Sequence, residues 1–140
     1  GLMGKLDGII VDDTQAKLEG PWQFSTAHTK YLGTSYQHDG ASSDGESLAT
    51  FTADLPEPGQ YEVRLAYTPN KNRASNVSVT VVHAEGPETV SVDQRKAPPI
   101  DGLFISLGKF EFGDVGTLTV SNKGADGYVI VDGAQWVPVK

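Results

Sequence analysis

Apolar and polar side chains alternate along much of this chain, and no other feature of the sequence constrains the fold as strongly. The clearest example is the alternation of Tyr61, Val63, Leu65 and Tyr67 with mostly polar neighbours. A period of two places alternate side chains on opposite faces of a β-strand. Helical spacing of apolar residues never lasts longer than a turn, and residues 14–19 are the one helical candidate. The sequence therefore predicts an all-β protein.

Roughly eight to ten short strands are expected, separated by turn residues at regular spacing. The strand-like segments are residues 8–13, 22–26, 47–53, 61–68, 77–81, 89–92, 103–112, 115–121 and 127–138. Residues 77–81 and 89–92 are expected to form a hairpin, and residues 115–121 are the expected antiparallel partner of residues 103–112. Without crossover helices, repeats or linkers, the pattern predicts one antiparallel β-sandwich of jelly-roll type over residues 1–140.

The first and last strands are expected to be neighbours in one sheet. Residues 127–138 are rich in β-branched and aromatic side chains, which is typical of a central strand buried on both faces. Residues 8–13 are similarly apolar and then abruptly acidic. Asp12 and Asp132 each follow an aliphatic run.

These two carboxylates are a candidate structural calcium site, because Ca²⁺ prefers several hard oxygen ligands. The prediction is a site formed by Asp12 and Asp132 where the first and last strands end. Asp39, with Asp44 and Glu46, is a looser second candidate. The alternative at both places is that the carboxylates are solvated or bonded to turns.

Composition and motifs argue against several classes of function. The 140 residues are enough to bury a core, and the absence of cysteine excludes thiolate catalysis and thiolate metal sites. A net charge of −7 argues against a nucleic-acid partner, because phosphate binding needs a concentrated basic surface. No apolar run approaches the roughly 18 residues of a membrane span, so membrane insertion is not expected.

Signals of catalysis are poor. No nucleophile elbow, phosphate-binding loop or dinucleotide-binding fingerprint is present, so the chain is not expected to be an enzyme or to hold an organic cofactor. His28, His38 and His83 do not have the spacing of a zinc site.

Two polar loops supply the sharpest candidate site. Its members are Tyr31, Tyr36, His38 and Asp39 from the first loop and Arg73 and Asn76 from the second. Sugars present apolar C–H faces and hydroxyl groups, so their sites combine aromatic rings with side chains that make paired hydrogen bonds. If the loops meet at one end of the sandwich, they form a carbohydrate-binding site. The alternative is an Arg73–Asp39 ion pair that fixes the loops, with Asn76 capping a turn and the tyrosines packed on the core. Trp22 and Trp136 are expected in the core.

Five motifs spread over almost the whole chain carry a family resemblance. They are Ile10-Val11-Asp12, Tyr36-Gln37-His38-Asp39-Gly40, Leu55-Pro56 with Gly59-Gln60-Tyr61-Glu62-Val63, Arg73-Ala74-Ser75-Asn76 leading into Val77-Ser78-Val79, and Gly127-Tyr128-Val129-Ile130-Val131-Asp132. The second and fourth are the most specific. Together these motifs resemble the golvesin C-terminal-like family, a domain also found at the end of xanthan lyases.

The resemblance implies a β-sandwich module that is appended to a secreted bacterial enzyme and regarded as carbohydrate-binding. It implies a polysaccharide or oligosaccharide ligand, a neighbouring catalytic domain in a longer chain, and an extracellular or periplasmic location. Asp44-Gly45-Glu46 departs from the Gly-rich, neutral or basic loop expected of the family, so a preference for anionic polysaccharides is not carried over. The alternative is a structural module that packs against a neighbouring domain or dimerises without a glycan ligand. It predicts an exposed apolar patch on the order of several hundred Å².

Overall fold

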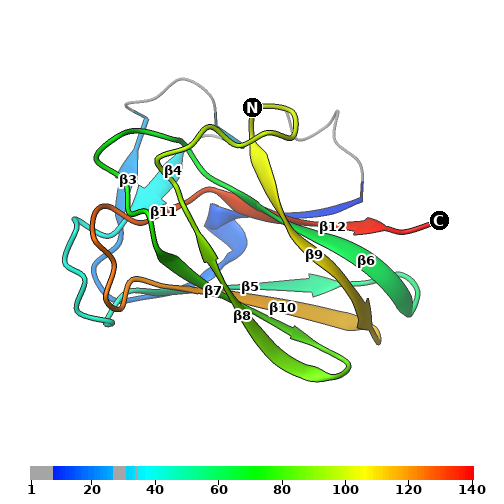
Figure 1. The fold of residues 1–140 in the computed structure, drawn as a ribbon. Helices are drawn as coiled ribbons and strands as arrows, with labels where there is room; N and C mark the ends of the chain where they lie inside the picture. Colours follow the sequence, from blue (N-terminus) through cyan, green and yellow to red (C-terminus); the bar gives the residue numbers. More distant parts are fainter. Residues whose placement is uncertain (1–7, 27–30, 34) are drawn as a thin grey trace.

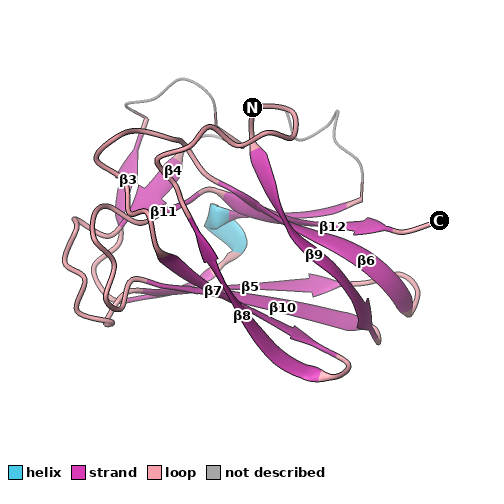
Figure 2. Cartoon of the chain, viewed as in Figure 1, coloured by secondary structure: helices cyan, strands magenta, loops and turns pink. Residues whose placement is uncertain are grey.

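The structure, a computed structural model, describes residues 8–26, 31–33 and 35–140. Two sheets face each other, and a third, smaller sheet lies at one end (Figures 1 and 2). The four-stranded sheet has the order β1 (Ile9–Asp12), β12 (Gly133–Pro138), β6 (Gly59–Ala66) and β9 (Phe104–Phe112). The five-stranded sheet has the order β2 (Lys17–Glu19), β5 (Leu48–Asp54), β10 (Val115–Ser121), β7 (Val77–His83) and β8 (Gly86–Val92). The third sheet has the order β11 (Ile130–Val131), β4 (Tyr36–His38) and β3 (Gln23–Ser25).

All the strand pairs in these sheets are antiparallel, which confirms the predicted jelly-roll type of β-sandwich. The described residues include one short 3₁₀ turn, η2 (Asp13–Gln15). Among the described residues, no helix is long and apolar enough to cross a membrane.

The core lies between the two large sheets. The inward side chains of β6 are buried, as their alternation predicts; Tyr61 exposes 3% of its surface and Val63 none. Trp136 on β12 is completely buried, and Trp22 packs against the core with its indole Nε1 donating to the Leu48 carbonyl at 3.1 Å. Both tryptophans therefore serve the core, as expected.

The predicted pairing of the first and last strands is confirmed. β1 runs antiparallel to β12, with Asp12 opposite Gly133. The expectation of one continuous strand over residues 127–138 is wrong, because the chain changes sheet at Asp132. Before this residue β11 pairs with β4, and after it β12 runs between β1 and β6. Residues 129–136 are all buried because the chain passes from one sheet to another inside the molecule.

Two other expectations differ from the structure. The strands β9 and β10 do not pair; β9 lies beside β6, and β10 lies between β5 and β7. The two-residue link 113–114 carries the chain from one large sheet to the other. The apolar side chains of β9 and β10 therefore face each other across the core. Residues 14–19 form no α-helix, because η2 ends after one turn and β2 then pairs with the edge of β5. The expected hairpin is present as β7 and β8.

Candidate functional site

The two loops of the candidate site meet at the end of the molecule that holds the third sheet. Tyr128 lies between them. Its carbonyl accepts a hydrogen bond from the Ala74 N–H at 2.7 Å, while the next carbonyl, that of Val129, accepts from the Asp39 N–H at 3.2 Å. The ring of Tyr128 meets the His38 ring edge to face, with centroids 5.5 Å apart. We call this end of the molecule the rim.

Asp39 is buried within the rim and bonded to the protein. It exposes 2% of its surface, and its Oδ1 accepts hydrogen bonds from the backbone N–H groups of Ala41 and Val129, each at 2.9 Å. Its Oδ2 accepts from the Asn122 amide at 3.0 Å. The carboxylate therefore fixes the first loop to the strand that follows Tyr128.

Arg73 is buried in the same way and exposes 5% of its surface. Its guanidinium donates to the carbonyl and hydroxyl oxygens of Thr68, at 3.0 and 3.1 Å, and to Asn72 Oδ1 at 2.8 Å. Burial lowers the pKa of the Arg73 guanidinium, while the neighbouring Tyr36 and Tyr128 raise it. The hypothesised Arg73–Asp39 ion pair is wrong, because each side chain has other partners and the two are not paired among the described residues.

The remaining members of the predicted set differ in exposure. Tyr36 exposes 2% of its surface and so offers no face for stacking on a ligand, whereas Tyr31 and His38 are half-buried. Asn76 is exposed, and its amide joins two backbone groups of the facing turn. It donates to the Gly124 carbonyl and accepts from the Asp126 N–H, both at 3.0 Å. Asn76 thus stabilises a turn, as the alternative hypothesis expected.

The predicted set of site residues did not contain Tyr128, the aromatic residue that joins the two loops. It is half-buried at the rim, where its ring packs on His38. The glycine that precedes it, Gly127, is the feature of the sequence that could have pointed to this position. A Cβ at that position would lie 2.7 Å from the Arg73 carbonyl oxygen, so the backbones pass unusually close there.

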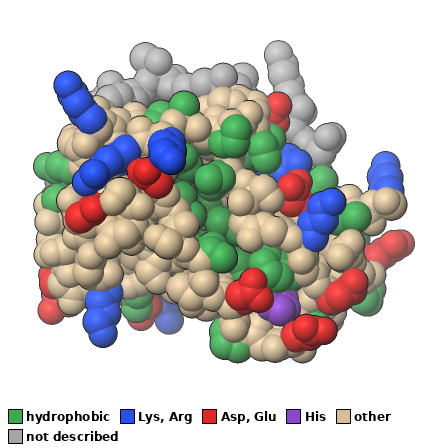
Figure 3. Space-filling model, viewed as in Figure 1, with side chains coloured by type: hydrophobic (Ala, Val, Ile, Leu, Met, Phe, Trp, Pro, Cys, Tyr) green, Lys and Arg blue, Asp and Glu red, His purple; other side chains and the backbone are tan. Residues whose placement is uncertain are grey.

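The surface at the rim carries mixed charge. Figure 3 shows basic and acidic side chains next to one another at the end of the molecule where Figure 1 places the third sheet. Arg95 and Asp126 contribute one such pair, with Arg95 Nη2 and Asp126 Oδ1 3.4 Å apart. Positive and negative side chains are therefore interspersed on the face shown.

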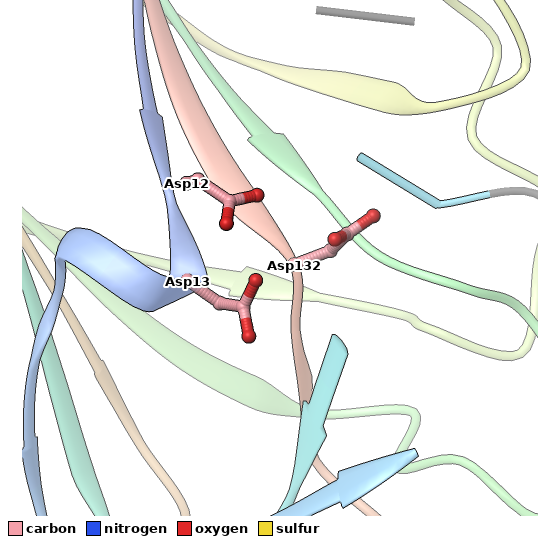
Figure 4. Close-up of side chains that lie close together, drawn as sticks. All are labelled: Asp12, Asp13 and Asp132. Atoms are coloured by element: carbon pink, nitrogen blue, oxygen red, sulfur yellow. The ribbon is translucent and has the colours of Figure 1, made fainter. Parts of the chain in front are cut away.

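A second cluster of functional groups lies where β1 and the link between β11 and β12 come together (Figure 4). It contains Asp12, Asp13 and Asp132, and a carboxylate oxygen of each lies within 4.8 Å of the others. The three residues expose 5%, 0% and 0% of their surface. The structure thus brings together the two predicted calcium ligands and adds Asp13, which the sequence analysis did not include.

Burial makes the charged forms of these carboxyl groups unfavourable. It raises the pKa of Asp132 to about 8; the Leu32 N–H opposes this rise, and the charges of Asp13 and Asp12 add to it. Burial likewise raises the pKa of Asp13 to about 7, against the effect of its hydrogen bond from Gln37. Carboxyl groups with pKa values raised in this way are partly or mostly protonated at neutral pH unless a positive partner lies beside them.

The other metal candidates lack such a geometry. Asp39 and Asp44 are bridged by the Asn122 amide, at 3.0 and 3.4 Å, and Asp44 also accepts from the Glu46 N–H at 3.0 Å. Of the histidines, His28 lies outside the described residues. Within the described ranges, the group of side chains that could hold a metal ion contains aspartates and no histidine.

Comparison with known proteins identifies the family. The family model of the Golvesin C-terminal domain matches residues 9–137. The chain belongs to this family. The resemblance carried by the five motifs is therefore confirmed.

Two xanthan lyases that resemble this chain are much longer than it. A xanthan lyase from Bacillus sp. (strain GL1) is 35% identical over 143 residues, and the match covers 96% of this chain and 15% of the lyase. The structure of a Paenibacillus xanthan lyase has a TM-score of 0.88 at 31% identity, over 96% of this chain and 13% of that one. A mannan-binding module from Man5C has the same fold, with a TM-score of 0.58 at 13% identity, over 94% of this chain and 98% of the module. The chain thus spans about 15% of the length of the curated lyase.

Proposed function

We propose that this chain is a non-catalytic accessory module that binds carbohydrate within a longer, secreted bacterial protein acting on polysaccharide. The observation that carries the proposal is the match of 96% of this chain to 15% of a xanthan lyase. A match that covers nearly all of this chain and a small part of the lyase is expected if the chain corresponds to one module and catalysis takes place in other domains. The proposal treats residues 1–140 as a single module, with an extracellular or periplasmic location.

The rim is the surface that we assign to the ligand. Tyr31, His38 and Tyr128 are half-buried there, and Asn76 is exposed. Aromatic rings pack on the C–H faces of sugars, while imidazole, phenol and amide groups bond to their hydroxyls. The fixed backbone beneath these side chains favours a site that needs little reordering on binding.

The buried members of the set have a positioning role in this proposal. Asp39 and Arg73 hold the two loops, and Tyr36 is buried near the Arg73 guanidinium. A site that contacts one or two sugar units should bind with a Kd on the order of micromolar to millimolar, and several modules in one protein would bind more tightly through avidity.

The chain offers a matched pair of variants for the test. The Nδ1 atoms of His38 and His83 each accept a backbone N–H from the residue two positions later, at 3.1 and 3.3 Å. Each ring also contacts an aromatic ring, Tyr128 for His38 and Phe110 for His83. Figure 1 places the third sheet and the β7–β8 turn at opposite ends of the molecule. The two side chains therefore share these two contacts and differ in location, although His83 Nε2 also lies 3.7 Å from Glu88 Oε1.

The experiment is calorimetric titration of the chain with xanthan, mannan and a neutral β-glucan. We expect binding to at least one glycan, a loss of tenfold or more in His38→Ala and Tyr128→Ala, and no change in His83→Ala. Tenfold corresponds to about 1.4 kcal/mol. If glycan binding is unchanged in both rim variants, the rim is not the binding surface. No binding by the unaltered chain at millimolar sugar favours the domain-packing alternative, and release of products on prolonged incubation contradicts a non-catalytic role.

A further inference from the structure

The three buried aspartates Asp12, Asp13 and Asp132 share a pattern of hydrogen bonding. In each, Oδ2 is bonded to the protein and Oδ1 has no hydrogen-bond partner among the described residues. Asp12 Oδ2 accepts from the Thr14 hydroxyl at 2.7 Å and Asp13 Oδ2 from the Gln37 amide at 3.0 Å. Asp132 Oδ2 accepts from the Leu32 N–H at 2.7 Å. The protein thus orients every carboxylate while leaving one oxygen of each unused.

Unused buried carboxylate oxygens are costly, because the group has lost its water and gained no replacement. No ion pair of the described residues involves Asp12, Asp13 or Asp132. A side chain that neutralises the cluster is therefore lacking among them. Three like charges this close repel one another strongly in a buried site.

The backbone at Gly33 lies close to one of these oxygens. Gly33 has a φ of 56°, and a Cβ there would lie 2.8 Å from Asp12 Oδ1. Any larger residue at position 33 would occupy the space next to this oxygen. Glycine at this position therefore avoids a clash with the Asp12 carboxylate.

We propose that Asp12, Asp13 and Asp132 bind one calcium ion through their carboxylate oxygens. Calcium takes six to eight oxygen ligands in flexible geometry, so three carboxylates with main-chain or water oxygens fit it. Zinc is a poorer match because its protein sites favour histidine and cysteine, and magnesium is poorer because it demands near-ideal octahedral geometry.

The ion would join parts of the chain that are distant in sequence. Asp12 is the last residue of β1 and Asp13 follows it, Asp132 links β11 to β12, and Gln37, the partner of Asp13, lies in β4. The site therefore ties the first strand to the segment that crosses between sheets. Its occupancy should stabilise the whole sandwich and does not depend on sugar binding.

The test measures stability and metal content. The calcium of the purified chain is measured by elemental analysis, and the chain is then stripped with EDTA and melted in NaCl, MgCl₂ or CaCl₂. We expect about one calcium per chain in the calcium-equilibrated protein, and a rise in Tm of roughly 5–10 °C at 100 times the Kd. Absence of a rise with CaCl₂ beyond that with MgCl₂ overturns the proposal.

Asp13→Asn separates metal binding from a purely structural role. The asparagine side chain has nearly the same shape and can still accept the Gln37 hydrogen bond, but it removes one of three buried charges. In EDTA the variant should melt at or above the Tm of the unaltered chain, whereas in CaCl₂ it should lose most of the calcium-induced rise. A structural role alone predicts the same change in both solutions, which would contradict the proposal.

Two further variants complete the test. Asp132→Asn should behave like Asp13→Asn, and it provides the answer if Asp13→Asn does not fold. Asp114→Asn is the control, because Asp114 is exposed in the link between β9 and β10 and should retain the full calcium effect. Retention of the full effect in both Asp13→Asn and Asp132→Asn would place the ion elsewhere and reject this site.

Discussion

Arg73 has the chemistry of a sugar-binding residue, yet its surroundings assign it to the fold. Its guanidinium donates hydrogen bonds to Thr68 and Asn72 of the same chain. Its backbone carbonyl accepts a hydrogen bond from Arg95 Nε at 2.8 Å. Removal of the guanidinium leaves the buried Thr68 oxygens without donors, and such a loss is more costly than the net value of a hydrogen bond. Loss of glycan binding on mutation of Arg73 would therefore be weak evidence for contact.

The first prediction follows from this burial. Arg73→Met keeps the apolar stem and removes the three donated hydrogen bonds, so we expect the free energy of unfolding to fall by roughly 2–4 kcal/mol. Urea denaturation measures the change. Lys71→Met, at an exposed position in the same loop, should change it by less than about 0.5 kcal/mol. A stable Arg73→Met variant that fails to bind glycan would instead make Arg73 a ligand contact.

Gly116 is a second residue whose identity is set by packing. A Cβ at this position of β10 would lie 2.5 Å from Nε1 of the buried Trp136. Gly116→Ala should therefore displace the indole and cost about 1–3 kcal/mol of stability, with a change in near-ultraviolet circular dichroism. Gly113→Ala is the matched control, because no atom lies within 4 Å of the added Cβ. Equal stability of the two variants would show that the core is more loosely packed than this contact requires.

At the scale of elements, the turn at residues 124–126 is attached to the start of β7 through Asp126. Its carboxylate accepts the backbone N–H of Ser75 at 2.7 Å and the Ser75 hydroxyl, and Arg95 lies nearby. The hydrogen bonds from Ser75 hold the pKa of Asp126 below its ordinary value, and the charge of Arg95 acts in the same direction. Ionised Asp126 therefore binds this turn more strongly than the protonated form does.

This shift predicts a pH dependence with a definite sign. Because the folded pKa is lower than the unfolded one, the stabilisation is complete above the unfolded value of about 3.9 and is lost as pH falls through the folded pKa. Asp126→Asn should lower Tm by a constant amount between about pH 5 and 8, and the difference should shrink below about pH 4. Thermal melts across this range test it. The exposed Asp54→Asn serves as the control, and a difference that grows on acidification would contradict the sign.

The sequence predicted these elements well where one strand face meets the core. Alternation located β6, β7 and β10, because every second side chain in them is buried. It could not predict that β9 and β10 lie in different sheets, since a two-residue link suits a hairpin as well as a crossing. It also missed the break at Asp132, because both sides of the break are equally apolar.

The candidate sites were predictable to a different extent. The meeting of the loops around His38 and Arg73 was expected from their polarity, but burial depends on tertiary packing that no local pattern encodes. Asp12 and Asp132 could be paired because each ends an aliphatic run. Asp13 could not be added, because its burial results from the 3₁₀ turn that follows β1 and from Gln37 of a distant strand.

At the scale of the whole molecule, the segment around Asp132 makes the sheets depend on one another. β11 belongs to the third sheet and β12 to the four-stranded sheet, while Trp136 on β12 reaches Gly116 of the five-stranded sheet. Asp132 is bonded on both sides, since its N–H donates to the Ala66 carbonyl and its carbonyl accepts from the Asp13 N–H. Loss of any one sheet would therefore remove contacts from the other two.

We accordingly expect the chain to unfold in one cooperative step. Tryptophan fluorescence reports the surroundings of Trp136 in the core and of Trp22, which packs against it, and far-ultraviolet circular dichroism reports all three sheets. The two urea transitions should superimpose, with the m-value of about 1–3 kcal/mol/M usual for a small two-state domain. Both should move together to higher urea when calcium is added, because an ion at Asp12, Asp13 and Asp132 would bind the folded state alone. Separate transitions, or a calcium effect on one probe alone, would show that the third sheet opens independently of the sandwich.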